Sequence, residues 1–540
     1  MATKKTGRKR TDGAGTEPAT TGMASLKDQI ARAMVKTVIA LPLLDQLNLE
    51  TAERLQHPAI APRLYDVIID LHQEYPNGRE DARDWVIQEI DNLIQTRPVA
   101  GGTVAEGVDK KKSDYTNQYI FARLSGDTIR NLVVADAALK KVIPETDPTR
   151  ISGPRAIYQI WEDFPVYPLI YGSVSTIKAD AGRAAFRAEG SGIVWAVIDS
   201  GIQGDHAHFR WHGNLKGQVM AWHRDFSGED DPLVDGFGHG THVAGIIAGE
   251  VPAGKKAEHP KIVAYTRMLK SDGDQTEREV TYERLKLASI CGMAPKTQLV
   301  SLKVIGANEQ GAVSNIIAAL AHIQTINANG RYLRIHGVNL SVGYAFDPEW
   351  FACGQSQLCV EVNRLVRSGV VVVVAAGNTG YGTVATEFNA ARKTGLAQSI
   401  NDPGNADGAI TVGSTHRTMP HVYGVSFFSS KGPTGDGRLK PDLVAPGEKV
   451  VSCAAGKLRR QIAEKLEASV DPNYIEHTGT SMAAPHVSGA AAALLSVKRE
   501  FIGLPERVKE IFVATAIDLR RERHFQGAGL IDLMRAIQSV

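Results

Sequence analysis

The stretch Val370-Val-Val-Val-Val374-Ala-Ala-Gly-Asn378 is the most apolar run of the 540-residue sequence. Its five valines do not alternate with polar residues, which is typical of a strand buried on both faces of a parallel sheet. A glycine and an asparagine follow the run, at the end of the strand where open parallel sheets carry their functional side chains. The stretch therefore predicts a buried strand with Asn378 at its tip.

Similar apolar runs lie on both sides of this stretch. They are residues 193–198, 299–305, 337–342 and 409–412, and a short run at 443–445. Apolar residues at helical spacing separate them, as in residues 314–326 and 360–366. Strands that alternate with helices predict a three-layer α/β domain with a central parallel sheet over residues 173–540.

The pattern is different before residue 113. Residues 1–23 are rich in Lys, Thr and Gly and predict a disordered basic tail, which could touch nucleic acid or be merely solvated. Three amphipathic stretches then predict a small helical module over residues 24–100. They begin at Ser25, at Leu64 and at Val86. Residues 101–112 have the composition of a linker.

Residues 113–172 form a third kind of segment, of mixed α+β pattern. Residues 119–124 are strand-like, residues 127–139 are helix-like, and residues 156–161 are strand-like again. The segment ends where the α/β pattern begins.

The composition is that of a soluble globular protein. Hydrophobic residues make up 43% and charged residues 22% of the chain. Lys and Arg number 61 against 59 acidic residues, and this net charge of +2 indicates no nucleic-acid partner. No stretch approaches the ~18 apolar residues that would span a membrane. No signal-peptide pattern is recognisable, so we expect a cytoplasmic protein.

The four cysteines are too few for a disulfide scaffold. Their spacing lacks the paired pattern of a structural zinc site. Cys353 and Cys359 could bridge a loop, or both could be free thiols.

Two candidate catalytic residues stand at the start of the α/β pattern. Asp199 directly follows the apolar run 193–198, so it either orients a base or caps a helix. Gly238-His239-Gly-Thr-His242 has glycines on both sides of His239, which expose its imidazole at a helix start. His242 lies one turn on and is expected to pack or hydrogen-bond locally. A metal site that includes His206, His208 and His212 is the alternative, but no carboxylate completes it.

Two further candidates lie in the second half of the chain. Gly479-Thr-Ser481-Met-Ala-Ala-Pro485 precedes an apolar helix, and Ser481 at its N-terminus is either a nucleophile or an N-cap. Asn378 is either an oxyanion donor or a turn residue. Peptide hydrolysis by serine needs a hydroxyl, a base, a carboxylate that orients the base, and oxyanion donors.

The order Asp, His, Ser is that of subtilisin, and the sequence resembles the subtilisin-like serine proteases (subtilases). Further matches are Lys303-Val304, Asn339-Leu-Ser341-Val-Gly343, and the stretch from Phe428-Ser-Ser-Lys-Gly-Pro433 to Lys440-Pro-Asp-Leu-Val-Ala-Pro446-Gly447. The resemblance covers roughly residues 173–540. Its long motifs are similar to those of the intracellular AprX-like branch.

The resemblance implies a serine endopeptidase that acts on proteins or peptides. Ser481 would attack the scissile carbonyl, His239 would take its proton, and Asp199 would orient the imidazole. Asn378 would bind the oxyanion together with the Ser481 N–H. The residues implied to line the pocket for the substrate residue before the cut are Ser341, Val342, Gly343, Ala375, Ala376 and Gly377.

Two departures from the family pattern concern calcium and the N-terminal region. Where many subtilases have a calcium-binding Asp, this sequence has His208, and a charged insertion at residues 250–289 replaces the second calcium loop. We therefore expect no cofactor, with calcium doubtful at this site. Residues 113–172 are similar to the inhibitory propeptide of the family; the alternative is an extension that stays attached.

Two rival functions remain open. The chain could be an inactive protease used as a binding scaffold, although all four catalytic positions are intact. It could also be a regulated protease whose helical module at residues 24–100 binds a protein partner that controls activation.

Overall fold

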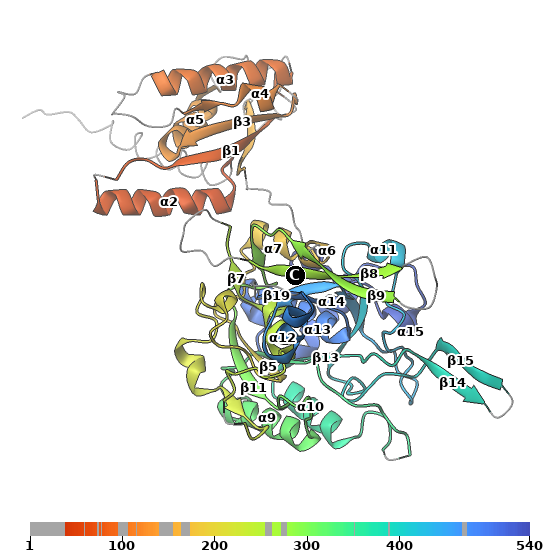
Figure 1. The fold of residues 1–540 in the computed structure, drawn as a ribbon. Helices are drawn as coiled ribbons and strands as arrows, with labels where there is room; N and C mark the ends of the chain where they lie inside the picture. Colours follow the sequence, from red (N-terminus) through yellow and green to blue (C-terminus); the bar gives the residue numbers. More distant parts are fainter. Residues whose placement is uncertain are drawn as a thin grey trace, which may run out of the picture. The chain divides into compact units, whose positions relative to one another are not determined.

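A computed structural model of the chain describes residues 38–58, 60–72, 75–76, 78–95, 106–114, 116–139, 155–163, 173–229, 231–253, 262–271, 278–349, 351–386, 389–466 and 472–540. The chain divides into two compact units, Met1–Val166 and Tyr167–Val540. Each is described by itself (Figure 1). The predicted tail and the amphipathic stretch that begins at Ser25 lie outside the described residues.

A seven-stranded sheet forms the centre of the second unit, and every pairing in it is parallel. Its strands, in spatial order, are β17 (Leu443–Glu448), β16 (Ile410–His416), β13 (Val371–Ala375), β12 (Gly337–Leu340), β5 (Val194–Asp199), β11 (Gln298–Lys303) and β6 (Arg224–Asp225). The valines of β13 are buried on both sides of the sheet, as their lack of alternation predicts.

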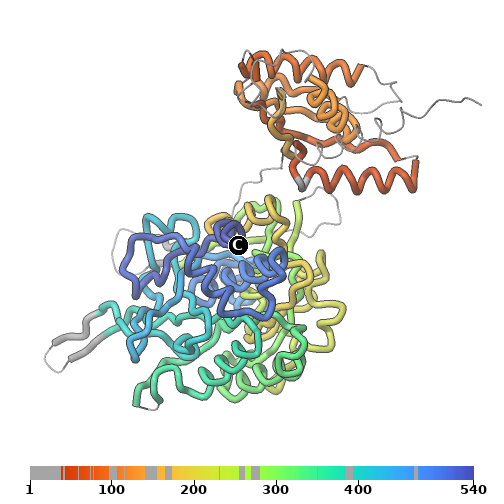
Figure 2. The backbone as a smooth tube through the Cα atoms, turned by 180° about the vertical axis from the view of Figure 1, so that it is seen from behind, coloured from red at the N-terminus to blue at the C-terminus, as the bar shows by residue number. Residues whose placement is uncertain are grey.

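Helices cover both faces of this sheet. One face packs against α9 (Val313–Ile326) and α10 (Gln357–Arg367), which lie in the green segment at the bottom of the unit in Figures 1 and 2. The other face packs against a larger apolar cluster that includes α8 (His239–Ile247), α13 (Thr480–Val497) and α14 (Pro505–Thr515). The predicted three-layer α/β fold with a central parallel sheet is confirmed.

Two hairpins are added to this core, and the strand analysis of the sequence did not predict them. The strands β8 (Ala264–Ser271) and β9 (Arg278–Leu285) join β18 (Val450–Cys453) and β19 (Tyr474–His477) in a four-stranded sheet. A second hairpin, β14 (Tyr381–Thr386) with β15 (Asn389–Gly395), projects from the unit in Figure 1. The first hairpin lies within the charged insertion at residues 250–289.

The first unit is an α+β sandwich of one sheet with helices on one face. Its antiparallel sheet has the order β2-β3-β1-β4. The strands are β1 (Leu64–Leu71), β2 (Gly107–Val108), β3 (Tyr119–Ser125) and β4 (Ile157–Glu162). The helices are α2 (Leu41–Gln56), α3 (Arg79–Gln95), α4 (Lys110–Ser113) and α5 (Gly126–Ala138). One apolar core joins α2, α3 and α5 to the sheet.

The prediction of a separate helical module over residues 24–100 is wrong. Residues 64–71 form the strand β1, which pairs with β3 on one side and β4 on the other. The predicted linker at 101–112 also contains β2 and the start of α4. The strand–helix–strand pattern of residues 113–172 is confirmed in β3, α5 and β4, but these elements complete a sheet whose central strand comes from the supposed module.

The cause of this error is the spacing of apolar residues in β1. Leu64, Val67, Ile68 and Leu71 fit one face of a helix, while Tyr65, Val67, Ile69 and Leu71 alternate and are the residues that β1 buries. The spacing of a helix face and the alternation of a strand are thus both present in these eight residues. The pairing with β3 and β4, which local sequence does not reveal, selects the strand.

Candidate active site

The four candidate catalytic residues lie at strand ends and helix starts of the second unit. Asp199 is the last residue of β5, and Asn378 lies three residues beyond the end of β13. His239 is the first residue of α8, and Ser481 is the second residue of α13. Parallel strands bring their carboxyl ends to one edge of the sheet, so these positions are close in space although they are far apart in sequence.

Asp199 and His239 form the best-defined contact of the site. Asp199 Oδ1 lies 2.7 Å from Nδ1 of His239; the Asp199 side chain is fully buried and that of His239 is 13% exposed. Burial alone would lower the pKa of the imidazole, but the charge and hydrogen bond of Asp199, together with the charge of Asp235, outweigh it and raise this pKa. The carboxylate therefore fixes the tautomer and favours the protonated ring.

Asp235, which the sequence analysis missed, holds the loop before His239. Its buried carboxylate accepts hydrogen bonds from Gly238 N (2.7 Å), Thr241 N (2.8 Å) and the hydroxyls of Thr241 (2.6 Å) and Ser200 (2.9 Å). Two of these donors are backbone N–H groups at the start of α8, where no intrahelical acceptor exists. An acidic residue four positions before a histidine at a helix start is the signal that could have revealed this anchor.

Gly240 permits the close approach of α8 to β5. A Cβ at this position would lie 2.2 Å from the carbonyl oxygen of Gly201 and 3.1 Å from Cβ of Asp199. A side chain at residue 240 would therefore push the start of α8 away from Asp199 and lengthen the 2.7 Å contact with His239.

Ser481 lies at the N-terminus of α13 with its hydroxyl directed to a backbone carbonyl. Its Oγ donates to Ser341 O at 3.0 Å, and the hydroxyl of Ser341 donates to Ser481 O at 2.9 Å. None of the hydrogen bonds within the described residues joins Ser481 Oγ to Nε2 of His239. Such contacts are often long in proteins without substrate, and a rotation about χ1 of Ser481 redirects the hydroxyl.

The amide of Asn378 is held in one orientation. Its Oδ1 accepts hydrogen bonds from Thr480 N (2.9 Å) and from the Thr480 hydroxyl (3.1 Å), which leaves Nδ2 as a donor. A Cβ at Gly479 would lie 3.3 Å from Nδ2 of Asn378 and 3.8 Å from Ser481 N. This Cβ would also lie 3.7 Å from Oδ1 of Asn378, so Gly479 lies beside the amide of Asn378 and near the N–H of Ser481.

The six residues predicted to line the substrate pocket lie around the same edge. Ser341, Val342 and Gly343 directly follow β12, while Ala375 ends β13 and leads into Ala376 and Gly377. Ser341 contacts Ser481, and Gly377 N donates to the Thr480 hydroxyl at 3.1 Å. For the other four the structure gives the position beside the site and not a role.

Two aromatic rings that the sequence analysis did not single out border His239. The ring of Phe237 is stacked on the imidazole with a centroid distance of 6.0 Å, and the ring of His477 meets it edge-on at 6.1 Å. Burial, together with the charges of His239 and Arg267, lowers the pKa of His477 to about 4. The imidazole of His239 therefore stands between the apolar ring of Phe237 and the neutral imidazole of His477.

The residues at the expected calcium position do not fit calcium. His208 is buried, its Nε2 lies 3.2 Å from Gly245 O, and its Nδ1 lies 3.3 Å from the Tyr474 hydroxyl. Burial lowers the pKa of His208 to about 3. Calcium requires six to eight oxygen ligands, and over the described part of the chain no group of three or more His, Cys, Asp or Glu side chains could hold a metal ion.

The other histidines and the cysteines also have local roles. His242 is buried with Nε2 3.1 Å from Ile475 O, so the prediction that it hydrogen-bonds locally is confirmed. His206 contacts Asn473 O at 2.9 Å and His212 contacts Glu250 at 2.8 Å. All four cysteines are free thiols, so Cys353 and Cys359 do not bridge the loop.

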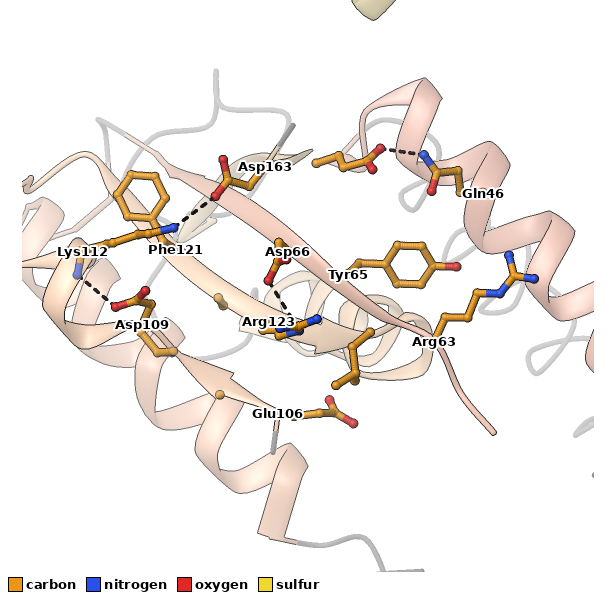
Figure 3. A pocket seen from close by; sticks show the side chains of 15 residues that line it. Gln46, Arg63, Tyr65, Asp66, Glu106, Asp109, Lys112, Phe121, Arg123 and Asp163 are labelled. Atoms are coloured by element: carbon orange, nitrogen blue, oxygen red, sulfur yellow. Dashed lines mark hydrogen bonds and ion pairs between the residues drawn. The ribbon is translucent and has the colours of Figure 1, made fainter. Parts of the chain in front are cut away.

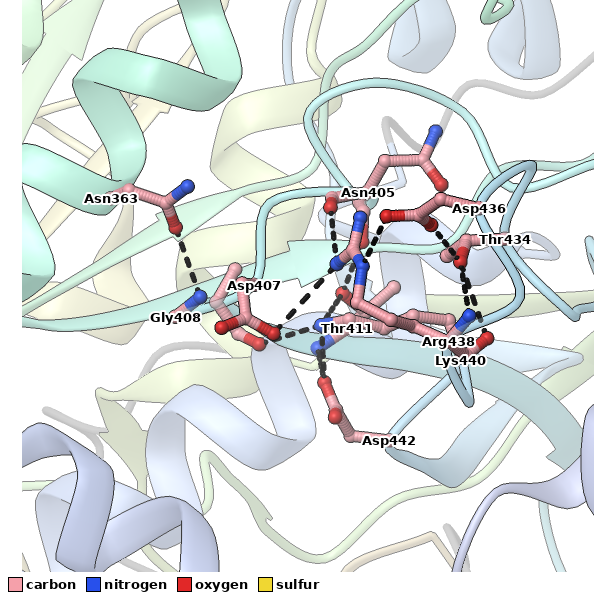
Figure 4. Close-up of polar contacts among 12 residues, drawn as sticks. Asn363, Asn405, Asp407, Gly408, Thr411, Thr434, Asp436, Arg438, Lys440 and Asp442 are labelled. Atoms are coloured by element: carbon pink, nitrogen blue, oxygen red, sulfur yellow. Dashed lines mark hydrogen bonds and ion pairs between the residues drawn. The ribbon is translucent and has the colours of Figure 1, made fainter. Parts of the chain in front are cut away.

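A buried ion-pair network lies away from these residues, in the stretch that begins at Lys440. Lys440 Nζ donates to Ala409 O, the Thr411 hydroxyl and Asp442 Oδ2 at 2.7–2.8 Å, as Figure 4 shows. Lys509 of α14 contacts the other oxygen of Asp442 at 3.0 Å. Burial lowers the pKa of Lys440 to about 7, against the attraction of Asp442. The network ties β16, β17 and α14 together.

A hollow of about 1100 Å³ lies in the first unit, over the sheet face that its helices leave open (Figure 3). Its charged residues pair with one another, as Arg123 does with Asp66 and Lys112 with Asp163, each at 3.6 Å. Gln46 donates to Glu162 at 2.6 Å. These pairs hold the rim of the hollow through contacts within the first unit.

A three-layer α/β unit with Asp, His and Ser in this order at one sheet edge defines a protein of the subtilisin type. A family model described as the subtilase family, Peptidase_S8, matches residues 190–529. The chain belongs to the subtilase family. This confirms the resemblance that its motifs indicated.

Relatives with known names are similar over the same region. Serine protease AprX of Bacillus subtilis is 27% identical over 330 residues, 60% of each chain. Pyrolysin of Pyrococcus furiosus is 29% identical over 333 residues, 56% of this chain and 21% of Pyrolysin. The major intracellular serine protease of Bacillus subtilis is 28% identical over 332 residues, 60% of this chain and 75% of that protein. The match thus spans less than two thirds of the first two relatives.

The first testable prediction concerns the protonation of His239. Its imidazole is expected to titrate with a midpoint above pH 6.5, because Asp199 and Asp235 outweigh burial. Asp199→Asn removes one of these charges, and the midpoint should then fall. Proton–nitrogen NMR of histidine-labelled protein measures both, with His242 as an internal control whose pKa burial holds well below 6.5. A midpoint that Asp199→Asn leaves unchanged would contradict the assignment.

Proposed function

We propose that the protein is a serine endopeptidase. Ser481 is the nucleophile, His239 the general base and acid, and Asp199 the residue that orients and stabilises the imidazole. The observation that carries the proposal is the 2.7 Å contact between Asp199 and His239, at the sheet edge where Ser481 hydrogen-bonds to Ser341. Membership of the subtilase family supports it.

In the proposed reaction, Ser481 Oγ leaves its hydrogen bond with Ser341 O and gives its proton to Nε2 of His239 as it attacks the scissile carbonyl. The protonated imidazole then donates this proton to the leaving amine. The raised pKa of His239 supports the base role, because it shows that Asp199 and Asp235 stabilise the imidazolium that forms.

The proposed oxyanion site is the space beside Gly479. Nδ2 of Asn378 and the Ser481 N–H donate to the oxygen of the tetrahedral intermediate, and the N-terminus of α13 favours its negative charge. Thr480 holds the amide of Asn378 in place before substrate arrives, so no reorganisation is needed as charge develops.

The proposed substrates are proteins or peptides. Residues 341–343 follow β12, while Ala375 ends the adjacent strand β13 and Ala376 and Gly377 follow it. Gly343 is exposed, and its backbone can pair with an extended peptide as an added strand, whereas Ala376 and Gly377 already hydrogen-bond within the unit. We propose from their position at this edge that the pocket is lined by Ser341, Val342, Gly343, Ala375, Ala376 and Gly377.

The second prediction separates the nucleophile from the oxyanion donor. Ser481→Ala is expected to abolish casein hydrolysis and labelling by a fluorophosphonate. Asn378→Ala should lower kcat about 10²–10³-fold with little change in KM, a range known for the oxyanion asparagine of subtilisin. Full casein hydrolysis by Ser481→Ala would sink the assignment, and an unlabelled wild type would favour the inactive scaffold.

We further propose that the first unit is an inhibitory propeptide that the enzyme removes from itself. It precedes the second unit in the chain, and its sheet leaves one face without helices. Ile68, Phe121 and Trp161 form a cross-strand apolar row on that face. Trp161 is 41% exposed. Exposed apolar patches mark surfaces that bind protein, so this row supports the proposed inhibitory role of the first unit.

The third prediction tests this processing. Wild-type protein is expected to be cut between residues 162 and 176, and Ser481→Ala should keep its full mass. The separated first unit should inhibit the enzyme in trans. Intact-mass measurement and inhibition assays check both, and an uncut wild type with full activity would rule the propeptide out.

We propose that the fold does not depend on calcium at the position of His208. The buried imidazole and its two protein partners support this, because they leave no oxygen ligand where the family has an Asp. The fourth prediction is that EDTA lowers the melting temperature by no more than a few degrees. A drop of tens of degrees would overturn the proposal.

We also propose that the protein acts inside the cell, on its similarity to a relative named the major intracellular serine protease. Within the described helices, none has the length and apolar character needed to cross a membrane. Cell fractionation tests the location, and activity confined to the medium would contradict it.

A further inference from the structure

The inserted hairpin β8–β9 lies beside the segment that leads to Ser481. The strand β19 ends at His477, four residues before Ser481. The strand β8 pairs with β19 in parallel, with Ala264 opposite Tyr474 and Tyr265 opposite Ile475. Because β8 continues for six residues beyond Tyr265, it runs past the point where the chain turns toward Ser481.

The register assigns the side chains of these strands to two faces. Thr266 and Glu476 share one face, which their hydrogen bond shows directly. Ile475 and His477 of β19, and Tyr265 and Arg267 of β8, therefore lie on the other face. His477 meets the ring of His239 edge-on at 6.1 Å, so this second face is the one that borders the catalytic base.

Arg267 is an exposed cation on this face. It lies two residues beyond Tyr265 on the same face of β8, and its charge is among the causes that lower the pKa of His477. Arg267 makes no ion pair with any residue that the structure describes. The nearby carboxylates of Glu476 and Glu283 belong to the opposite face, where Glu283 stands across from Thr266.

The apolar cover of this face reaches Tyr282, which stands opposite Arg267, and leaves Arg267 itself exposed. The helix α12 (Gly456–Lys465) packs its Leu458 and Ile462 against Ile475 and Tyr282, and Tyr265 is only 8% exposed. Arg267, two residues further along β8, is exposed. The guanidinium is therefore accessible at the margin of the face, next to His477.

The chemistry of peptide cleavage indicates which part of a substrate lies near Arg267. His239 must give its proton to the leaving amine, so the residues after the cut begin beside the imidazole. The rings that border the imidazole are those of Phe237 and His477. A substrate chain that leaves past His477 comes within reach of Arg267.

We propose that Arg267 is a specificity-determining residue that binds an acidic side chain of the substrate within the first two residues after the scissile bond. The inference rests on the proposed endopeptidase function and adds a substrate preference to it. An exposed pair of this kind contributes about three- to fivefold in binding and weakens with added salt.

The fifth prediction uses pairs of peptides that differ by one residue. The peptide sequence is taken from a site at which wild type cuts casein, mapped by mass spectrometry. Glu or Gln is then placed in the first or second position after the cut. Wild type is expected to show a kcat/KM about three- to fivefold higher for Glu than for Gln at low salt in at least one position. Arg267→Ala should abolish this ratio while it keeps the rate on the Gln peptide, and Arg267→Glu should reverse it.

Arg284→Ala is the matched control. Arg284 is an exposed arginine on the same face of the hairpin, but it stands opposite Tyr265 and not beside His477. The control should keep the wild-type ratio. Equal ratios in wild type and Arg267→Ala, with both peptides cleaved, would overturn this inference alone. No cleavage of casein by fully processed wild type would overturn the proposed function and the inference with it.

Discussion

The parallel pairing of β5, β12 and β13 is the constraint on which the site depends. It brings the ends of the three strands to one sheet edge, with Asp199 at the end of β5, residues 341–343 after β12 and Asn378 beyond β13. The helices α8 and α13 begin at the same edge, and each contributes one candidate residue from its first turn. No single segment contains the site, so its geometry is only as rigid as the sheet beneath it.

Buried charge must be compensated for this arrangement to be stable. Asp199 and Asp235 are both buried within the space around α8, where an unpaired carboxylate is costly. Asp235 is offset by four donors, two of them N–H groups at the start of α8. Asp199 is offset by His239 and Ser200 N. Asp235 positions the start of α8, and Asp199 holds the imidazole of His239. The two acidic residues thus have distinct roles at one helix start.

Local sequence predicts the strands of the core because each buried strand is an uninterrupted run of apolar residues. The valines of β13 fit no other environment, and the glycines around His239 indicate a close backbone approach that Gly240 makes with Gly201. The strand β1 was predicted as a helix because its apolar residues satisfy both periods. Asp235 was missed because its importance lies in four partners that only the fold assembles. The hairpin β8–β9 was missed because its charged residues resemble a solvated loop.

The inserted hairpin leaves the core undisturbed because a short strand pair joins the two ends of the insertion. The strands β7 (Glu250–Val251) and β10 (Ile290–Cys291) pair antiparallel at its base, so the two ends of the insertion already lie side by side. Such an insertion adds little closure entropy to the connection between α8 and β11. The core helix α8 and the core strand β11 therefore keep their places. Under the proposed function, a cation placed as Arg267 is therefore changes the substrate preference without any change in the four candidate catalytic residues.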